Sequence, residues 1–274
     1  MSTAAEVDAP MRRHVPPTHE LTFGGLVRSE LIKLVTARSL VVLLVLTALC
    51  TAGLSIPVAL FTEPDAQQSA ADLLPTFINT TLIGMQLSIF LIAAIGAIAG
   101  ASDFGNGTIR LAFGAAPRRT PVLAAKLAAV GGASSALVGV TILVTAVVNW
   151  LALTPGPLGT PLNDRASVLS LVGTVVATAG VSVSAISLGC LLRSSAGAIF
   201  AILGLLIVLT IALMTVPAEV LPSAISSHSF GAAVTTLLES ANNTGRWLGA
   251  VAALVAWSGA LTGFAVLSLR RRDV

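Results

Sequence analysis

The chain has 274 residues, of which 55% are hydrophobic and only 10% are charged. A soluble domain carries about 25% charged residues, and a folded globule of this size still exposes a large polar exterior, so the composition excludes a soluble protein. Lipid must be the solvent for much of the chain, whose mean hydropathy is +0.94. The pI of about 9.5 reflects basic residues that flank the apolar segments, which argues against nucleic-acid binding.

The N-terminal region divides into two parts. Residues 1–20 contain three prolines and few apolar side chains, so we expect a disordered cytoplasmic tail. Over residues 21–38 an apolar arc recurs at helical spacing, formed by Phe23, Val27, Leu31, Leu34 and Val35. We interpret this segment as an amphipathic helix in the membrane interface, and a simple basic flank is the alternative.

Six windows of 23 to 37 residues then carry no charged side chain. A helix needs roughly 20 mostly apolar residues to cross a ~30 Å hydrocarbon layer, so each window is long enough for one crossing. The sequence therefore predicts an all-α polytopic membrane protein with a six-helix transmembrane domain over residues 39–270. The expected spans are approximately 40–61, 78–101, 124–149, 167–191, 196–216 and 247–269.

Two of the segments that connect the spans have patterns that predict their local structure. Residues 103–121 form a loop in which Thr108 can cap a short helix over 109–116 that Pro117 would end. Residues 219–246 lie between the fifth and sixth spans and are rich in serine and threonine, so we do not count a seventh span. This segment can be extracellular or can re-enter the membrane, where irregular backbone is tolerated only if protein or water shields it.

The basic residues predict the orientation. Thirteen of the fifteen lie on one side of the predicted spans, whereas only Arg165 and Arg246 lie on the other. The positive-inside rule therefore places both termini in the cytoplasm. The thirteen are Arg12, Arg13, Arg28, Lys33, Arg38, Arg110, Arg118, Arg119, Lys126, Arg193, Arg270, Arg271 and Arg272.

Motifs for catalysis are missing from the sequence. It contains neither the GxxxxGK[ST] phosphate-binding loop nor HExxH, so we expect no enzyme activity, no catalytic residue, no metal site and no cofactor bound by this chain. An intramembrane peptidase would need Ser258 and His228 at hydrogen-bond distance, and their predicted separation argues against it. Cys50 and Cys190 lie in different spans at different depths, so we expect no disulfide.

Small residues are frequent in the predicted spans. Gly96 and Gly100 form a GxxxG pattern, which is typical of close helix packing or dimerisation in membranes. No charged residue lies near the centre of any span, which lowers the expectation of a proton-coupled carrier.

Two segments resemble the permease subunits of type-2 ATP-binding-cassette (ABC) exporters. The first, with Glu30 and Lys33 before the first span, is similar to the S-E-x-x-K entry of bacterial members. The second lies between spans two and three and is similar to the family's E-x-x-x-G-T-x-x-x-L-x-x-x-P-x-x-R-x-x-x-x-x-K run, with aspartate in place of the glutamate. Its matching residues are Asp103, Gly107, Thr108, Leu111, Pro117, Arg118 or Arg119, and Lys126.

The resemblance implies a function and partners. In such exporters a separate P-loop ATPase, which holds ATP and magnesium, docks on the loop between spans two and three. Mapped here, that loop with Arg110 is the coupling segment, and Glu30 and Lys33 lie beside it. The implied partners are this ATPase, a second permease copy or sister permease, and the lipid bilayer of a bacterial plasma membrane. The alternative is a stand-alone channel or secondary carrier for a small or amphipathic solute, and the substrate does not follow from the sequence.

Overall fold

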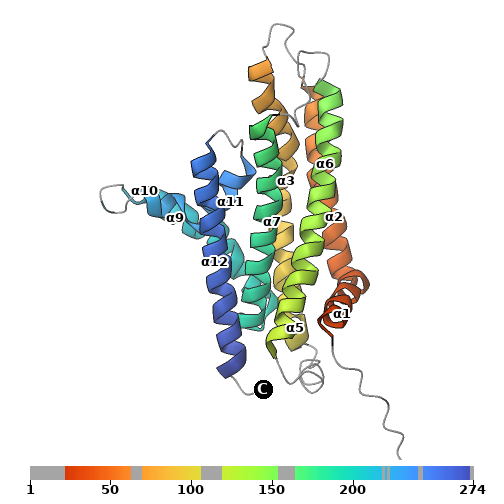
Figure 1. The fold of residues 1–274 in the computed structure, drawn as a ribbon, viewed down its shortest axis with the longest axis vertical. Coiled ribbons are helices and arrows are strands. Elements are labelled where there is room, and N and C mark those ends of the chain that lie inside the picture. The colour runs from red at the N-terminus through yellow and green to blue at the C-terminus, as the bar shows by residue number, and fades with distance from the viewer. Residues whose placement is uncertain are drawn as a thin grey trace, which may run out of the picture.

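The computed structural model describes residues 22–62, 70–105, 119–153, 164–217, 220, 223–239 and 243–271. Over these residues the protein is all α-helical, and six helices are long and apolar enough to cross a membrane (Figure 1). The prediction of an all-α fold with six long apolar helices is thereby confirmed. These helices cover Arg38–Phe61, Leu73–Phe104, Thr120–Leu153, Arg165–Leu192, Ser195–Thr215 and Thr244–Arg270.

Two of these spans are built from more than one helical element. Both contain π-helical turns, which are labelled η and interrupt the α-helices on either side. The elements in chain order are α1 (Phe23–Thr36), α2 (Arg38–Phe61), α3 (Ala70–Gly105), α5 (Arg119–Lys126), η1 (Leu127–Gly131), α6 (Gly132–Leu153), α7 (Arg165–Leu192), α8 (Ser195–Leu203), η3 (Gly204–Val208), α9 (Leu209–Thr215), α10 (Ser223–Ser227), α11 (Phe230–Leu238) and α12 (Thr244–Arg271).

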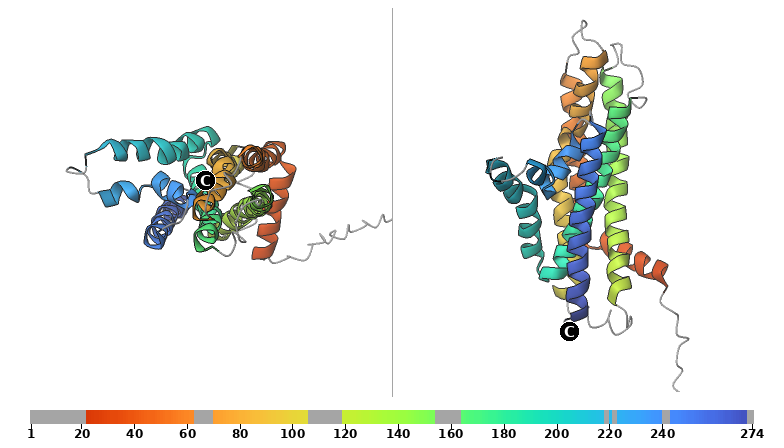
Figure 2. Two further views of the ribbon diagram at one scale, coloured as in Figure 1. Left: turned by 90° about the horizontal axis from the view of Figure 1, so that it is seen from above. Right: turned by 60° about the vertical axis from the view of Figure 1, so that its left-hand side comes forward.

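Helix α1 lies across one end of the bundle, beside the start of α2 and close to α5 (Figures 1 and 2). Thr22 caps it, because its hydroxyl oxygen accepts a hydrogen bond from the Gly25 amide at 3.2 Å. The helix buries Glu30 and Leu34 against the bundle. It leaves Phe23 and Val35 exposed, so part of the predicted apolar arc faces outward and Leu34 faces the bundle.

Helices α3 and α7 form the centre of the bundle. In each of them 61% of the most apolar window is buried, against 22% for α2 and for α12. Glycines allow the two backbones to approach closely, since a Cβ placed at Gly96 would lie 2.8 Å from the Cβ of Ala185. In the other direction, a Cβ at Gly189 would lie 2.6 Å from the carbonyl oxygen of Ala97. The two glycines of the GxxxG pattern, Gly96 and Gly100, therefore pack against α7 of the same chain.

A buried polar seam joins α2, α3 and α6. The Thr51 hydroxyl donates to the Ser88 hydroxyl at 2.8 Å, and the Ser55 hydroxyl donates to the Thr81 carbonyl oxygen at 3.0 Å. The side-chain amide of Asn149 on α6 donates to the Thr81 hydroxyl at 3.2 Å. Such interhelical hydrogen bonds satisfy polar groups that would be costly in hydrocarbon.

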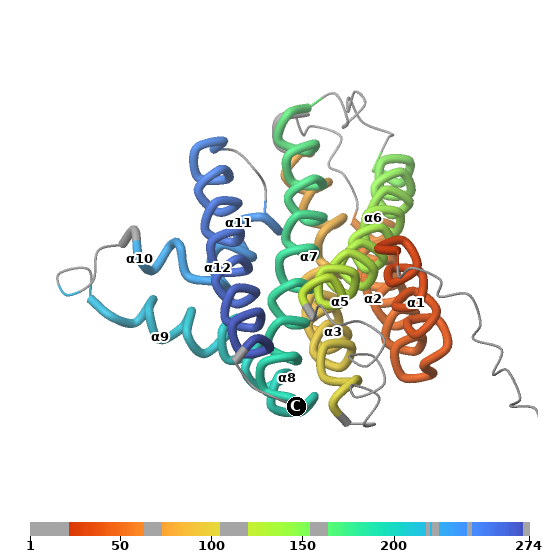
Figure 3. The backbone as a smooth tube through the Cα atoms, turned by 60° about the horizontal axis from the view of Figure 1, so that its bottom comes forward, coloured from red at the N-terminus to blue at the C-terminus, as the bar shows by residue number. Residues whose placement is uncertain are grey.

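The fourth and fifth spans form a hairpin with a very tight turn. Helix α7 ends at Leu192, and the residue that follows it, Arg193, has a left-handed φ of 54°. The Ser194 hydroxyl then caps α8 by accepting from the Gly197 amide at 3.2 Å. From this turn α8 packs against α3 and α7, α9 then diverges from the bundle, and α10 and α11 return toward α12 (Figures 1 and 3).

Helix α11 packs inside the bundle, although its residues fall in the predicted 219–246 connection. The indole N–H of Trp257, near the middle of α12, donates to the His228 carbonyl oxygen at 3.2 Å. The Phe230 and Trp257 rings meet edge to face with centroids 6.3 Å apart. The chain between the fifth and sixth spans therefore reaches the level of the middle of α12 and turns back from there.

Candidate functional site

Four charged side chains meet at the end of the bundle where α1 lies. Glu30 and Lys33 come from α1, Asp103 comes from the last turn of α3, and Lys126 is the last residue of α5. They form four ion pairs, in which each lysine contacts both carboxylates. We call these residues the charge clamp, because they connect three elements that are far apart in the sequence.

Lys126 is the central residue of the charge clamp, and its side chain is only 3% exposed. Its Nζ lies 3.0 Å from Glu30 Oε2 and 2.9 Å from Asp103 Oδ2. The same ammonium donates a hydrogen bond to the Ala99 carbonyl oxygen at 2.9 Å. All three hydrogens of the ammonium thus have an acceptor, which is the condition under which a buried charge is tolerated.

Lys33 completes the charge clamp on its outer side. Its Nζ lies 2.6 Å from Glu30 Oε1 and 3.2 Å from Asp103 Oδ1, and 49% of its side chain is exposed. Burial by itself lowers the pKa of Lys33, but the hydrogen bond to Glu30 and the negative charges of Asp103 and Glu30 outweigh it, so the pKa is raised above 10.5. The ammonium is therefore charged at neutral pH.

The helix containing Lys126 changes its winding directly after this residue. Residues Leu127–Gly131 form the π-helical turn η1, and the regular α-helix resumes at Gly132. A π-turn inserts one residue into an α-helix, and such insertions occur frequently at functional sites. The clamp thus lies where the third span is least regular.

The end of α7 lies beside the charge clamp. The Cys190 thiol donates to the Gly100 carbonyl oxygen at 3.4 Å, and Cys50 and Cys190 are both free. The Arg193 guanidinium lies 5.2 Å from the centroid of the Phe104 ring, in the geometry of a cation–π contact. The last turn of α3 therefore contacts α7 through Phe104 and the charge clamp through Asp103.

The sequence-predicted site residues fall into four groups. Glu30, Lys33, Asp103 and Lys126 are brought together, whereas Gly96 and Gly100 lie apart from them at the α3–α7 contact. Arg119 begins α5, but its side chain is not described. Six predicted residues and the expected short helix over 109–116 lie outside the described residues, and these six are Gly107, Thr108, Arg110, Leu111, Pro117 and Arg118.

Three features of the site were not identified from the sequence. Sequence reasoning included the four charged residues, but it did not predict that they pair with one another or that the Ala99 carbonyl accepts from Lys126. The Arg193–Phe104 contact was also missed. Glu30 and Lys33 are three positions apart on one helix, but the other contacts have no local pattern, since Lys33 and Asp103 are 70 positions apart.

The possible peptidase pair does not meet. The Ser258 hydroxyl donates to the Gly180 carbonyl oxygen at 3.2 Å and lies 3.1 Å from the Ser184 hydroxyl, so it faces α7. His228 Nδ1 instead lies 3.1 Å from the Ser227 hydroxyl. Within the part of the chain that the structure describes, no group of three or more His, Cys, Asp or Glu residues can hold a metal ion.

The fold and the charge clamp define a class of protein: a six-helix, all-α protein of the multi-pass membrane type. At one end of its bundle, two ammonium groups pair with two carboxylates. Two ammonium groups and two carboxylates in mutual contact suit a mechanical connection between helices. Comparison with known proteins found no family model and no curated protein that matches the chain.

Proposed function

We propose that this protein is the permease subunit of an ATP-driven exporter of the type-2 ABC class in a bacterial plasma membrane. It forms the translocation path, and a separate P-loop ATPase supplies ATP hydrolysis with its own magnesium. It works with a second permease copy or a sister permease, and both chain termini are cytoplasmic. The observation that carries the proposal is the charge clamp at the base of the 103–121 loop.

The clamp supports coupling because it connects the helices before and after this loop, α3 and α5, to α1. Asp103, in the last turn of α3, contacts the Lys33 ammonium of α1. Lys126, the last residue of α5, contacts the Glu30 carboxylate of α1 and also contacts Asp103. A force on the loop is therefore transmitted at once to α1, α3 and the third span. A rigid connection of this kind is what an ATPase needs in order to move the spans.

The loop itself supplies the docking surface in this proposal. Arg110, Arg118 and Arg119 give it three positive charges in a stretch of ten residues, from position 110 to position 119. Charged rims of this kind steer a partner and set its orientation on an interface. Glu30 and Lys33 lie beside the loop and transmit the motion to α1.

The test is co-purification from native membranes in mild detergent, with the partner identified by mass spectrometry. One variant carries Arg110, Arg118 and Arg119 changed to Glu, and its control carries Arg165→Glu and Arg246→Glu at the opposite predicted side. We expect a protein with a GxxxxGK[ST] loop to co-purify with the wild type and the control and to be lost from the loop variant. A folded wild type without any such ATPase would contradict the proposal and favour a stand-alone channel or carrier.

A further inference from the structure

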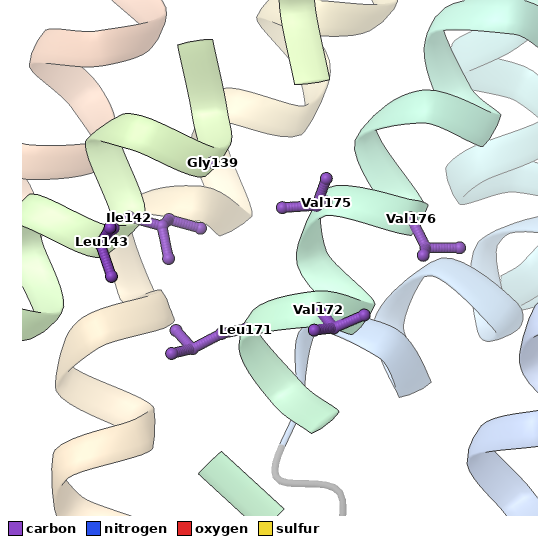
Figure 4. A pocket seen from close by; sticks show the side chains of 7 residues that line it. All are labelled: Gly139, Ile142, Leu143, Leu171, Val172, Val175 and Val176. Atoms are coloured by element: carbon purple, nitrogen blue, oxygen red, sulfur yellow. The ribbon is translucent and has the colours of Figure 1, made fainter. Parts of the chain in front are cut away.

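An open groove runs between α6 and α7, and every side chain that lines it is apolar. Its volume is about 300 Å³. Gly139 and Leu143 line it from α6, and Leu171, Val172 and Val175 are among the residues that line it from α7. Figure 4 shows Leu171 and Val175 pointing from α7 toward α6.

Gly139 leaves the space in which the groove lies. A Cβ at this position would be 3.6 Å from the nearest Val175 methyl carbon, which is an ordinary contact, so the glycine is not required by tight helix packing. It lies near the middle of the Thr120–Leu153 span, so the groove is at hydrocarbon depth in a membrane. Leu143 and Val172 are 52% and 46% exposed, which means that the groove opens sideways toward lipid.

A cationic side chain lies on the same stripe of α7 as the groove. Arg165, Val168 and Val172 are spaced i, i+3 and i+7, so they share one face of the helix. At 1.5 Å per residue, Val172 is about 10 Å along the helix axis from Arg165. Arg165 is exposed, and within the described ranges of the chain no ion pair involves it.

We propose that the groove binds one acyl chain of an anionic phospholipid whose headgroup contacts Arg165. The apolar lining suits the chain, and the guanidinium at the end of α7 suits the phosphate, with which it can form two parallel hydrogen bonds. No lining side chain offers a polar group to a hydrophilic solute. Lipid binding in this groove requires only the membrane-spanning fold, so it does not depend on an ATPase partner.

Native mass spectrometry of the delipidated full chain measures this binding directly. Dioleoylphosphatidylglycerol and dioleoylphosphatidylcholine are added separately, and the affinity of the first bound lipid is compared. We expect the wild type to bind dioleoylphosphatidylglycerol about fivefold more tightly than dioleoylphosphatidylcholine, because one arginine near an anionic headgroup contributes about this factor. Arg165→Gln removes this preference, whereas Arg246→Gln, at an exposed position near the start of α12, leaves it unchanged.

A second variant tests the groove. Gly139→Leu fills it and weakens both lipids several-fold, whereas Gly259→Leu on α12, where a Cβ meets nothing within 4 Å, weakens neither. Equal affinity of the wild type for both lipids would overturn the proposal, as would a preference that survives Arg165→Gln. If Gly139→Leu fails to fold by thermal unfolding and gel filtration, the preference measured on Arg165→Gln still decides.

Discussion

At the scale of single residues, Lys126 determines how the end of the bundle is held together. It is buried, and it contacts carboxylates from both α1 and α3. Without Lys126, Glu30 and Asp103 share only the half-exposed Lys33 ammonium, and an unbalanced buried charge costs more than the pair itself contributes. The charge clamp is therefore expected to be sensitive to the loss of one member and tolerant of the matched loss of two.

We expect Lys126→Met to destabilise the protein by about 3–5 kcal/mol, because Glu30 and Asp103 lose their buried ammonium. Combining it with Glu30→Gln is expected to restore part of this loss, which a double-mutant cycle measures. Unfolding in detergent, driven by heat or by dodecyl sulfate, reports the stability. Lys33→Met is the control and costs less, since its side chain is 49% exposed. Additive effects of Lys126→Met and Glu30→Gln would contradict the clamp.

Lys33 gives the clamp a dependence on alkaline pH. Its pKa in the folded protein is raised above 10.5, so its stabilising contribution is complete below the unfolded value and is lost as pH rises through the folded value. We expect the difference in thermal midpoint between wild type and Lys33→Met to stay constant from about pH 7 to about pH 10 and to shrink above that. The chain has no tyrosine, so no phenol titrates in this range. A difference that already shrinks between about pH 7 and about pH 10 would contradict the raised pKa.

At the scale of elements, the contact between α3 and α7 is the centre of the bundle. Gly96 faces Ala185 so closely that any added side chain forces the helices apart. We expect Gly96→Ala to cost about 1–3 kcal/mol, the range for overpacking a well-packed core. Gly259→Ala, on an open face of α12, is the matched control and is expected to be nearly neutral. Equal effects of the two substitutions on unfolding would show that α3 and α7 do not pack as described.

Composition and periodicity predicted the long helices well, because a span of about 20 apolar residues has few alternatives in lipid. They did not predict the packing of α11. Its stretch from Phe230 to Leu238 is short, contains two threonines and lacks the length of a span, yet Phe230, Val234 and Leu237 are buried. Short apolar runs are ambiguous in sequence, and their burial depends on neighbours such as Trp257 that lie elsewhere in the chain.

At the scale of the whole molecule, the contacts between elements in the charge clamp likewise could not be predicted from composition and periodicity. The sequence indicated that Glu30, Lys33, Asp103 and Lys126 matter, through their resemblance to an exporter family and their position at the ends of spans. Their pairing across elements could not be predicted, because it depends on how α1 lies beside α5 and brings its side chains to the end of α3. The π-turn η1 after Lys126 has no clear sequence signal either, apart from its small residues.

We propose that an ATPase moves this bundle through the loop between α3 and α5, and a contact between the ATPase and that loop tests this proposal most directly. A photo-reactive amino acid at Leu111 is activated in native membranes, and the cross-linked protein is identified by mass spectrometry, with Arg165 as the control position. We expect position 111 to cross-link to a protein with a GxxxxGK[ST] motif and position 165 not to do so. Efficient cross-linking from position 111 to lipid or other proteins, with no such ATPase among them, would contradict the claim.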